Sequence, residues 1–151
     1  MHEEAEKHNS LSIEEVRELW SKTYNKHGKP DWSHIFHLYN ENIIFHDSIQ
    51  KIEGKDEFLK MINRLTNRCK SLHMELYTIT KTDNIVMMDW KMTMSFRVFP
   101  ESPMFGATKL TFNDEGSIIE QRDYYDLWGD IYDRVPLFGI FYRWFMRSFF
   151  G

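Results

Sequence analysis

Cysteine is almost absent from this 151-residue sequence, and long apolar runs are missing altogether. The single cysteine, Cys69, excludes an internal disulfide and suits a reducing compartment. No stretch approaches the roughly 18 consecutive apolar residues of a membrane-spanning helix. The first residues are charged and lack the apolar segment of a secretory signal peptide. We therefore expect a cytoplasmic location.

An excess of basic residues is also missing, because 19 Lys and Arg stand against 23 Asp and Glu, for a net charge of −4. A chain of this charge has no overall surplus of positive charge to neutralise phosphates, so we expect no nucleic-acid partner. Aromatic residues are abundant instead, with 5 Trp, 7 Tyr and 12 Phe. Such a composition indicates a large core, a ligand pocket or an interface.

Hydrophobic periodicity predicts helices first and strands later. Ser12 and Glu15 form a capping box at the start of a first helix, which Gly28 and Pro30 end. Helices segregated from an antiparallel sheet predict an α+β fold in one domain, residues 1–151, with a disordered tail at 1–10 and a helical extension at 128–151. The further elements that we predict are helices at 31–39 and after 54, and strands at 43–47, 72–80, 84–99, 105–113 and 116–128.

The strand predicted at 84–99 alternates apolar and polar side chains. Trp90 and its methionine neighbours Met88, Met92 and Met94 share one face, which is the pattern of a plain core strand. The same face also suits the wall of a hydrophobic pocket for a flat or lipid-like ligand. Both interpretations stay open at this point.

The last predicted strand places an acid on an apolar face. In the run from Gly116 to Trp128, alternation puts Asp123 beside Ile119, Tyr125 and Leu127. An isolated charge on such a face is too costly, so the carboxyl must be paired, hydrogen-bonded or shifted in pKa. Asp123 is therefore the first candidate for chemistry, and the alternative is an ion pair with an arginine on another element.

Three passages together resemble the nuclear transport factor 2-like superfamily, and most of all its SnoaL-like proteins, with ketosteroid isomerases and limonene epoxide hydrolases as relatives. These passages are the short strand ending at Asp47 with the Gly54-led helix, the long strand around Trp90, and the run Gly116 to Asp126. The resemblance covers about residues 11–130. It implies a cone-shaped cystatin-like fold, in which a curved antiparallel sheet wraps around three N-terminal helices and a pocket opens at the wide end. It also implies cofactor-free chemistry and a homodimer.

The resemblance implies roles for individual residues. Asp47 falls where ketosteroid isomerases keep the general-base aspartate, and Tyr24 or Tyr39 is placed to supply their tyrosine. Asp123 falls where limonene epoxide hydrolases and SnoaL-like cyclases keep an acid–base aspartate. The other epoxide hydrolase residues correspond to about Trp90 and Met92, so that catalytic set is broken here.

Other polar side chains are weaker candidates. His46 and Tyr125 are predicted ligand-binding residues beside the two aspartates, although a structural role is the commoner one for such a histidine. The pair His34 and His37 has metal-binding spacing on a helix, but without a Cys or Glu in register we predict no metal site.

Two hypotheses from different classes follow. The first is a cofactor-free isomerase, cyclase or hydrolase in which Asp123 and Asp47 move protons on an apolar small molecule. The second is a non-catalytic dimeric module that binds a ligand in the same cone, or a partner or membrane through the segment 128–151. That segment holds nine aromatic residues and no acid after Asp133. Packing onto the chain's own sheet or into a dimer interface is the alternative use of these aromatics.

Overall fold

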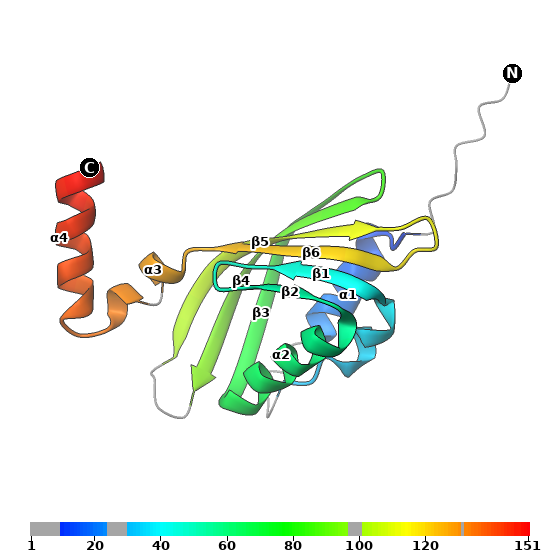
Figure 1. Cartoon of the computed structure of the whole chain (residues 1–151), viewed down its shortest axis with the longest axis horizontal. Coiled ribbons are helices and arrows are strands. Elements are labelled where there is room, and N and C mark those ends of the chain that lie inside the picture. The colour runs from blue at the N-terminus through cyan, green and yellow to red at the C-terminus, as the bar shows by residue number, and fades with distance from the viewer. Residues whose placement is uncertain (1–9, 24–29, 97–100, 131) are drawn as a thin grey trace, which may run out of the picture.

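The structure is a computed structural model of the whole chain and describes residues 10–23, 30–96, 101–130 and 132–151 (Figure 1). The disordered tail predicted at 1–10 therefore falls almost wholly outside the described residues, as does the end of the strand predicted at 84–99. The elements in chain order are α1 (Ile13–Thr23), the 3-10 helix η1 (Ser33–Leu38), β1 (Tyr39–His46), β2 (Lys51–Glu53), α2 (Lys55–Arg68), β3 (Cys69–Thr82), β4 (Ile85–Phe96), β5 (Ser102–Phe112), β6 (Ile118–Tyr125), α3 (Leu127–Asp130), the 3-10 helix η2 (Tyr132–Arg134) and α4 (Phe138–Phe150).

One six-stranded sheet in the order β2-β1-β6-β5-β4-β3 organises the fold. It is curved and open, with α1 and α2 on one face, as Figure 1 shows. The α+β class is confirmed, but the prediction of an all-antiparallel sheet is wrong. Strand β1 pairs with β6 in parallel, while the other neighbours are antiparallel. The reason is that α2 carries the chain from β2 to β3 at the opposite edge, and a meander then returns it beside β1.

The start of α1 follows from local sequence. The backbone N–H of Glu15 donates to the Ser12 hydroxyl at 3.2 Å, and the Ser12 N–H donates to the Glu15 carboxylate at 2.8 Å. The predicted capping box is therefore confirmed. The first helical turn ends in Val16, which is fully buried against the sheet.

Replacing Ser12 with Ala removes the oxygen that accepts the Glu15 N–H. We expect the free energy of unfolding to fall by about 1 kcal/mol, measured by urea denaturation. Asn at position 12 restores a capping oxygen and is the matched control. A fall of the same size in the Asn variant would show that the capping oxygen is not what stabilises this helix.

The segment after α1 differs from its prediction. The helix expected at 31–39 is a shorter 3-10 helix, and β1 begins at Tyr39 rather than at residue 43. The N–H of Ser33 donates to the Asp31 carboxylate at 2.9 Å, and this i to i+2 turn tightens the helix start. The three-residue β2 was not predicted, because its run is shorter than the window in which alternation can be recognised.

The core lies between the sheet and its covering helices. On β4 the residues predicted to share one face, Met88, Trp90, Met92 and Met94, are all buried, and so is Val86 on the same face, so this alternation is confirmed. From the other side, α2 contributes the buried side chains Phe58 and Ile62.

Strand β6 departs from its predicted alternation at its first two residues. Ile118 is fully buried and Ile119 is only partly buried, the reverse of the prediction. Phe112 pairs with Ile118 and Thr111 pairs with Glu120, so Ile119 is an extra residue in a bulge. The bulge shifts the alternation once, and from Gln121 onward the predicted faces hold.

After β6 the chain leaves the sheet through α3 and η2, and α4 stands apart from the body of the fold (Figure 1). Helix α4 begins at Phe138, two residues after Pro136. None of the helices in the described part of the chain has the length and apolar character that a membrane crossing needs.

Candidate functional site

A cavity of about 420 Å³ lies between the sheet and the helices that cover it. Most of its wall is apolar, and α1, η1, α2 and every strand except β2 contribute to it. A volume of this size is in the range of small-molecule sites. The apolar lining includes Trp20, Trp32, Ile35, Phe45, Phe58, Met61, Ile62, Leu65, Met74, Trp90, Met92, Met94, Phe96, Met104 and Leu127.

Asp123 is the acid that β6 points into this cavity. Its Oδ1 accepts the Thr108 hydroxyl at 2.8 Å and the Gln121 side-chain amide at 3.2 Å. Thr108 lies directly opposite Asp123 on β5, and Gln121 lies two residues earlier on the same face of β6. Oδ2 receives one longer bond, 3.3 Å from the same Gln121 amide. Oδ2 therefore has the greater free capacity to accept a proton.

Two further donors fix the residues that hold Asp123. The indole N–H of Trp90 donates to the Thr108 hydroxyl at 2.9 Å, so the hydroxyl proton is directed to the carboxylate. The Tyr39 hydroxyl donates to the Gln121 carbonyl oxygen at 2.6 Å, which orients the amide nitrogen toward Asp123. All four side chains line the cavity. The network therefore runs in one direction, toward one carboxylate.

Burial raises the pKa of Asp123 from an ordinary 3.8 to about 6. Loss of hydration is the main cause, the bonds from Thr108 and Gln121 oppose it, and the negative charge of Asp47 adds to it. Near neutral pH this group is mostly ionised and still easily protonated. A pKa close to neutral pH suits a general acid–base group.

Asp47 lies at the exit of β1 and lines the same cavity. Its Oδ1 accepts the backbone N–H groups of Ile49 and Gln50 at 2.8 and 2.9 Å, so it shapes the turn into β2. Its Oδ2 accepts the Tyr125 hydroxyl at 3.0 Å. Both oxygens already have donors, and Asp47 is therefore less available for proton transfer than Asp123.

Tyr125 lies between the two carboxylates. Burial, the charge of Asp47 and the hydrogen bond to it raise the pKa of this phenol far above its ordinary value, so it stays neutral. Its ring also packs against Trp90, with the ring centres 6.5 Å apart. The phenol is thus a fixed hydrogen-bond donor in the cavity wall.

The structure brings together five of the predicted site residues, namely Asp123, Asp47, Tyr39, Trp90 and Tyr125. His46 is half-buried and is not part of the cavity lining, because its neighbours Phe45 and Asp47 point inward and alternation turns it away. Tyr24 lies outside the described residues. Trp90 is both a core residue and a cavity residue.

Gln121 and Thr108 are the site residues that sequence reasoning missed. Gln121 had a signal, since it precedes Asp123 by two residues on one strand face. Thr108 had none, because its place opposite Asp123 depends on the pairing register of β5 and β6.

No metal cluster of three or more His, Cys, Asp or Glu occurs in the described part of the chain. The ring nitrogen Nε2 of His34 lies 2.9 Å from the Leu19 carbonyl oxygen, so this histidine is used within the fold. The residues that the structure describes thus contain no ready-made ligand set.

Residues 15–121 match the family described as "Uncharacterized conserved protein (DUF2358)", and the chain belongs to this family. A comparison with curated proteins found no match.

Solved structures of similar shape identify the fold. A protein named as a SnoaL-like polyketide cyclase, from Jannaschia sp. CCS1, is 20% identical, with a TM-score of 0.63 over 84% of this chain and 91% of that one. A hypothetical protein with a ketosteroid isomerase-like fold, from Catenulispora acidiphila DSM 44928 and solved in complex with trimethylamine, is 14% identical, with a TM-score of 0.64 over 77% and 88%. An epoxide hydrolase of the limonene epoxide hydrolase type from M. tuberculosis is 13% identical, with a TM-score of 0.55 over 64% and 71%. Further similar structures are described as NTF2-like proteins. The fold is therefore NTF2-like, and the resemblance predicted from the sequence is confirmed at that level.

Proposed function

We propose that the chain binds an apolar small molecule in this cavity and that Asp123 transfers a proton to or from it without a cofactor. The observation that carries the proposal is a carboxyl of pKa about 6, held by a network of donors inside an apolar cavity. In this role Oδ2 of Asp123 takes a proton from a carbon or oxygen acid of the ligand and returns it at a neighbouring atom. Isomerisation, cyclisation and hydrolysis are the reaction classes that such a group serves.

The geometry assigns supporting roles to the neighbours. Thr108 and Gln121 hold Oδ1, so the carboxylate cannot rotate freely when Oδ2 accepts a proton. Tyr125 and Tyr39 supply the phenolic hydroxyls of the lining, and Tyr125 is placed to donate to an oxygen of the ligand when its bond to Asp47 is exchanged. Trp90 and the methionines supply the apolar contact area.

A specific observation favours a second candidate, a non-catalytic ligand-binding module. Asp47, the second carboxylate that the resemblance implies, has both oxygens engaged in a turn and by Tyr125. A mechanism that needs two free carboxylates therefore has only Asp123 available, whereas ligand binding needs only the cavity.

Hydrogen exchange separates the two candidates. A panel of apolar ketones and enones with acidic α-protons is incubated with the protein in D₂O, and exchange and binding are followed by NMR. We expect saturable binding, and an exchange rate above that of buffer that rises with pH through about 6, as Asp123 ionises. Saturable binding with no exchange would leave the ligand-binding module as the function. If the panel shows no binding and no exchange, both candidate functions are contradicted.

A further inference from the structure

We propose that α4 binds an anionic membrane surface, lying flat in the lipid headgroup region. The proposal does not depend on the chemistry of the cavity. It rests on the exposure of this helix, the distribution of its arginines, and the way the chain fixes its position.

The helix exposes an unusually apolar face. Ile140, Phe141, Trp144 and Phe145 follow the i, i+1, i+4, i+5 spacing that places them on one side of a helix. Their exposed fractions are 74%, 61%, 60% and 40%. Exposed apolar groups gathered on one element mark an interaction site rather than ordinary surface. Trp and Phe are also the residues that interfacial helices use at the level of lipid headgroups.

Basic residues border this face. Arg143 and Arg147 lie one helical turn apart and are both exposed. Residues 134–151 contain three arginines and no acid, whereas the rest of the chain has a net charge of −7. An anionic surface therefore attracts this segment and repels the remainder. The same contrast keeps the acidic remainder of the chain away from the lipid while α4 is bound.

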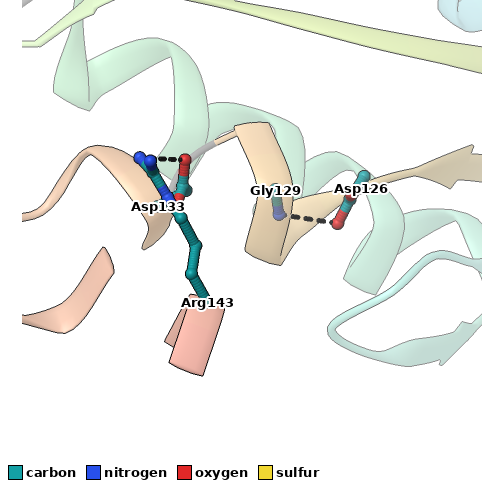
Figure 2. A network of polar contacts seen from close by, with 4 residues as sticks. All are labelled: Asp126, Gly129, Asp133 and Arg143. Carbon is teal, nitrogen blue, oxygen red and sulfur yellow. Dashed lines mark hydrogen bonds and ion pairs between the residues drawn. The ribbon is translucent and has the colours of Figure 1, made fainter. Parts of the chain in front are cut away.

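The helix is positioned so that binding requires no rearrangement of the sheet. Its inner side stacks on α3, with Trp128 at 6.0 Å from Phe138 and 5.8 Å from Tyr142 between ring centres. The guanidinium of Arg143 donates twice to the Asp133 carboxylate, at 2.6 and 2.8 Å, as Figure 2 shows. In the same figure Asp126 accepts the Gly129 N–H at 2.8 Å and so closes the first turn of α3. The apolar face is thus held outward on a short, braced connection.

The length of the helix decides how it meets the lipid. Thirteen residues span about 20 Å, which is too short to cross the apolar layer of a bilayer of about 30 Å. A helix of this kind lies in the interface, with its apolar side chains inserted and its arginines at the phosphates.

A second copy of the chain is the competing occupant of this face. Two α4 helices packed through Ile140 and Trp144 would bring Arg143 and Arg147 of each copy close together. Arg143 of each copy is already paired with its own Asp133, whereas α4 offers no acidic residue to Arg147. Like charges at such a contact destabilise it. The lipid surface supplies the opposite charge, and we therefore favour it.

Vesicle pelleting with the full chain tests the proposal. Phosphatidylcholine vesicles with about one-third phosphatidylserine are compared with pure phosphatidylcholine vesicles. We expect the protein to pellet with the anionic vesicles at least about tenfold more than with the neutral ones, and to be released by about 0.5 M salt. The double variant Phe141→Ser/Trp144→Ser and the single variant Arg147→Glu are expected to lose this binding. Tyr77→Ser removes an aromatic side chain that is 51% exposed on β3 and is the matched control. Circular dichroism checks that each variant is folded.

Other outcomes contradict the proposal. Equal binding to both kinds of vesicle would show that charge does not drive the binding. No binding to either would show that α4 does not bind lipid. A dimer in sedimentation equilibrium that Phe141→Ser/Trp144→Ser converts to a monomer, without vesicle binding by the parent protein, would assign the face to a second copy.

Discussion

The Asp123→Asn variant is expected to be more stable than the parent protein at pH 8 and to lose at least about 100-fold in proton transfer. These two effects have one cause. The folded protein holds the Asp123 carboxylate where it is poorly hydrated, and this raises its pKa from 3.8 to about 6. A pKa raised by about 2 corresponds to about 3 kcal/mol of lost stability at pH 8. Asn has the same shape and keeps an oxygen for Thr108 and Gln121, but carries no charge.

The pH dependence gives this prediction its sign. Below about pH 4 both the folded and the unfolded chain keep Asp123 protonated, so the charge of this residue costs nothing. Between about pH 4 and pH 6 the unfolded chain releases its proton while the folded protein retains it. The unfolding free energy of the parent protein therefore falls through this window because of Asp123, and levels off above it. The advantage of Asp123→Asn should be near zero at pH 4 and reach about 1–3 kcal/mol at pH 8.

Urea denaturation of both proteins at several pH values measures this difference, and Asp89→Asn is the matched control. Asp89 is an exposed carboxylate on β4 that accepts the Thr78 N–H, so its replacement should give no comparable pH-dependent gain. If Asp123→Asn is destabilising at every pH, then the carboxylate serves the fold and is not a strained functional group.

Gly106→Ala is the second substitution with a large expected effect. Strand β5 passes close under Trp90, and a Cβ at position 106 would lie 2.6 Å from Cζ2 of Trp90 and 2.7 Å from the Tyr124 carbonyl oxygen. Neither group can easily move, because Trp90 is buried and bonded to Thr108 and the Tyr124 oxygen belongs to the backbone. We expect a loss of about 2–3 kcal/mol in unfolding free energy. Displacement of the indole would also break the Trp90–Thr108 bond and disturb Asp123.

A double-mutant cycle with Trp90→Phe isolates this contact. Phe lacks the outer ring atoms that the new methyl group meets, so Gly106→Ala should cost at least about 1 kcal/mol less in the Trp90→Phe background. Urea denaturation of the four proteins gives the coupling. Additive effects would mean that the clash with the Tyr124 backbone, and not with Trp90, sets the cost.

The sequence predicted those parts of the fold that local patterns encode. The Ser12–Glu15 capping box and the inward face of β4 depend on spacing alone, and both were predicted correctly. The parallel pairing of β1 with β6 could not be predicted in this way, because it depends on where α2 delivers the chain. The Ile119 bulge likewise depends on the register with β5.

The residues of the candidate site also fall into those that a local pattern predicts and those that depend on strand pairing. Asp123 was visible as an acid on an apolar strand face, and that signal is a property of the strand itself. Its partner Thr108 is 15 residues away on another strand, and only the pairing register brings the two together. The engagement of Asp47 in its own turn could not be predicted from the sequence either, because an acid at a strand exit serves either a turn or a site.

The titration of Asp123 tests the central claim most directly. The carboxyl carbon of this residue is followed by NMR in the labelled full chain between about pH 3 and pH 9, with Asp123→Asn used to assign its signal. We expect a midpoint near 6, because the cavity withholds hydration from a carboxylate that its hydrogen bonds only partly stabilise. A midpoint near 4, the value of an exposed aspartate, would contradict the account and leave the cavity without its acid–base group.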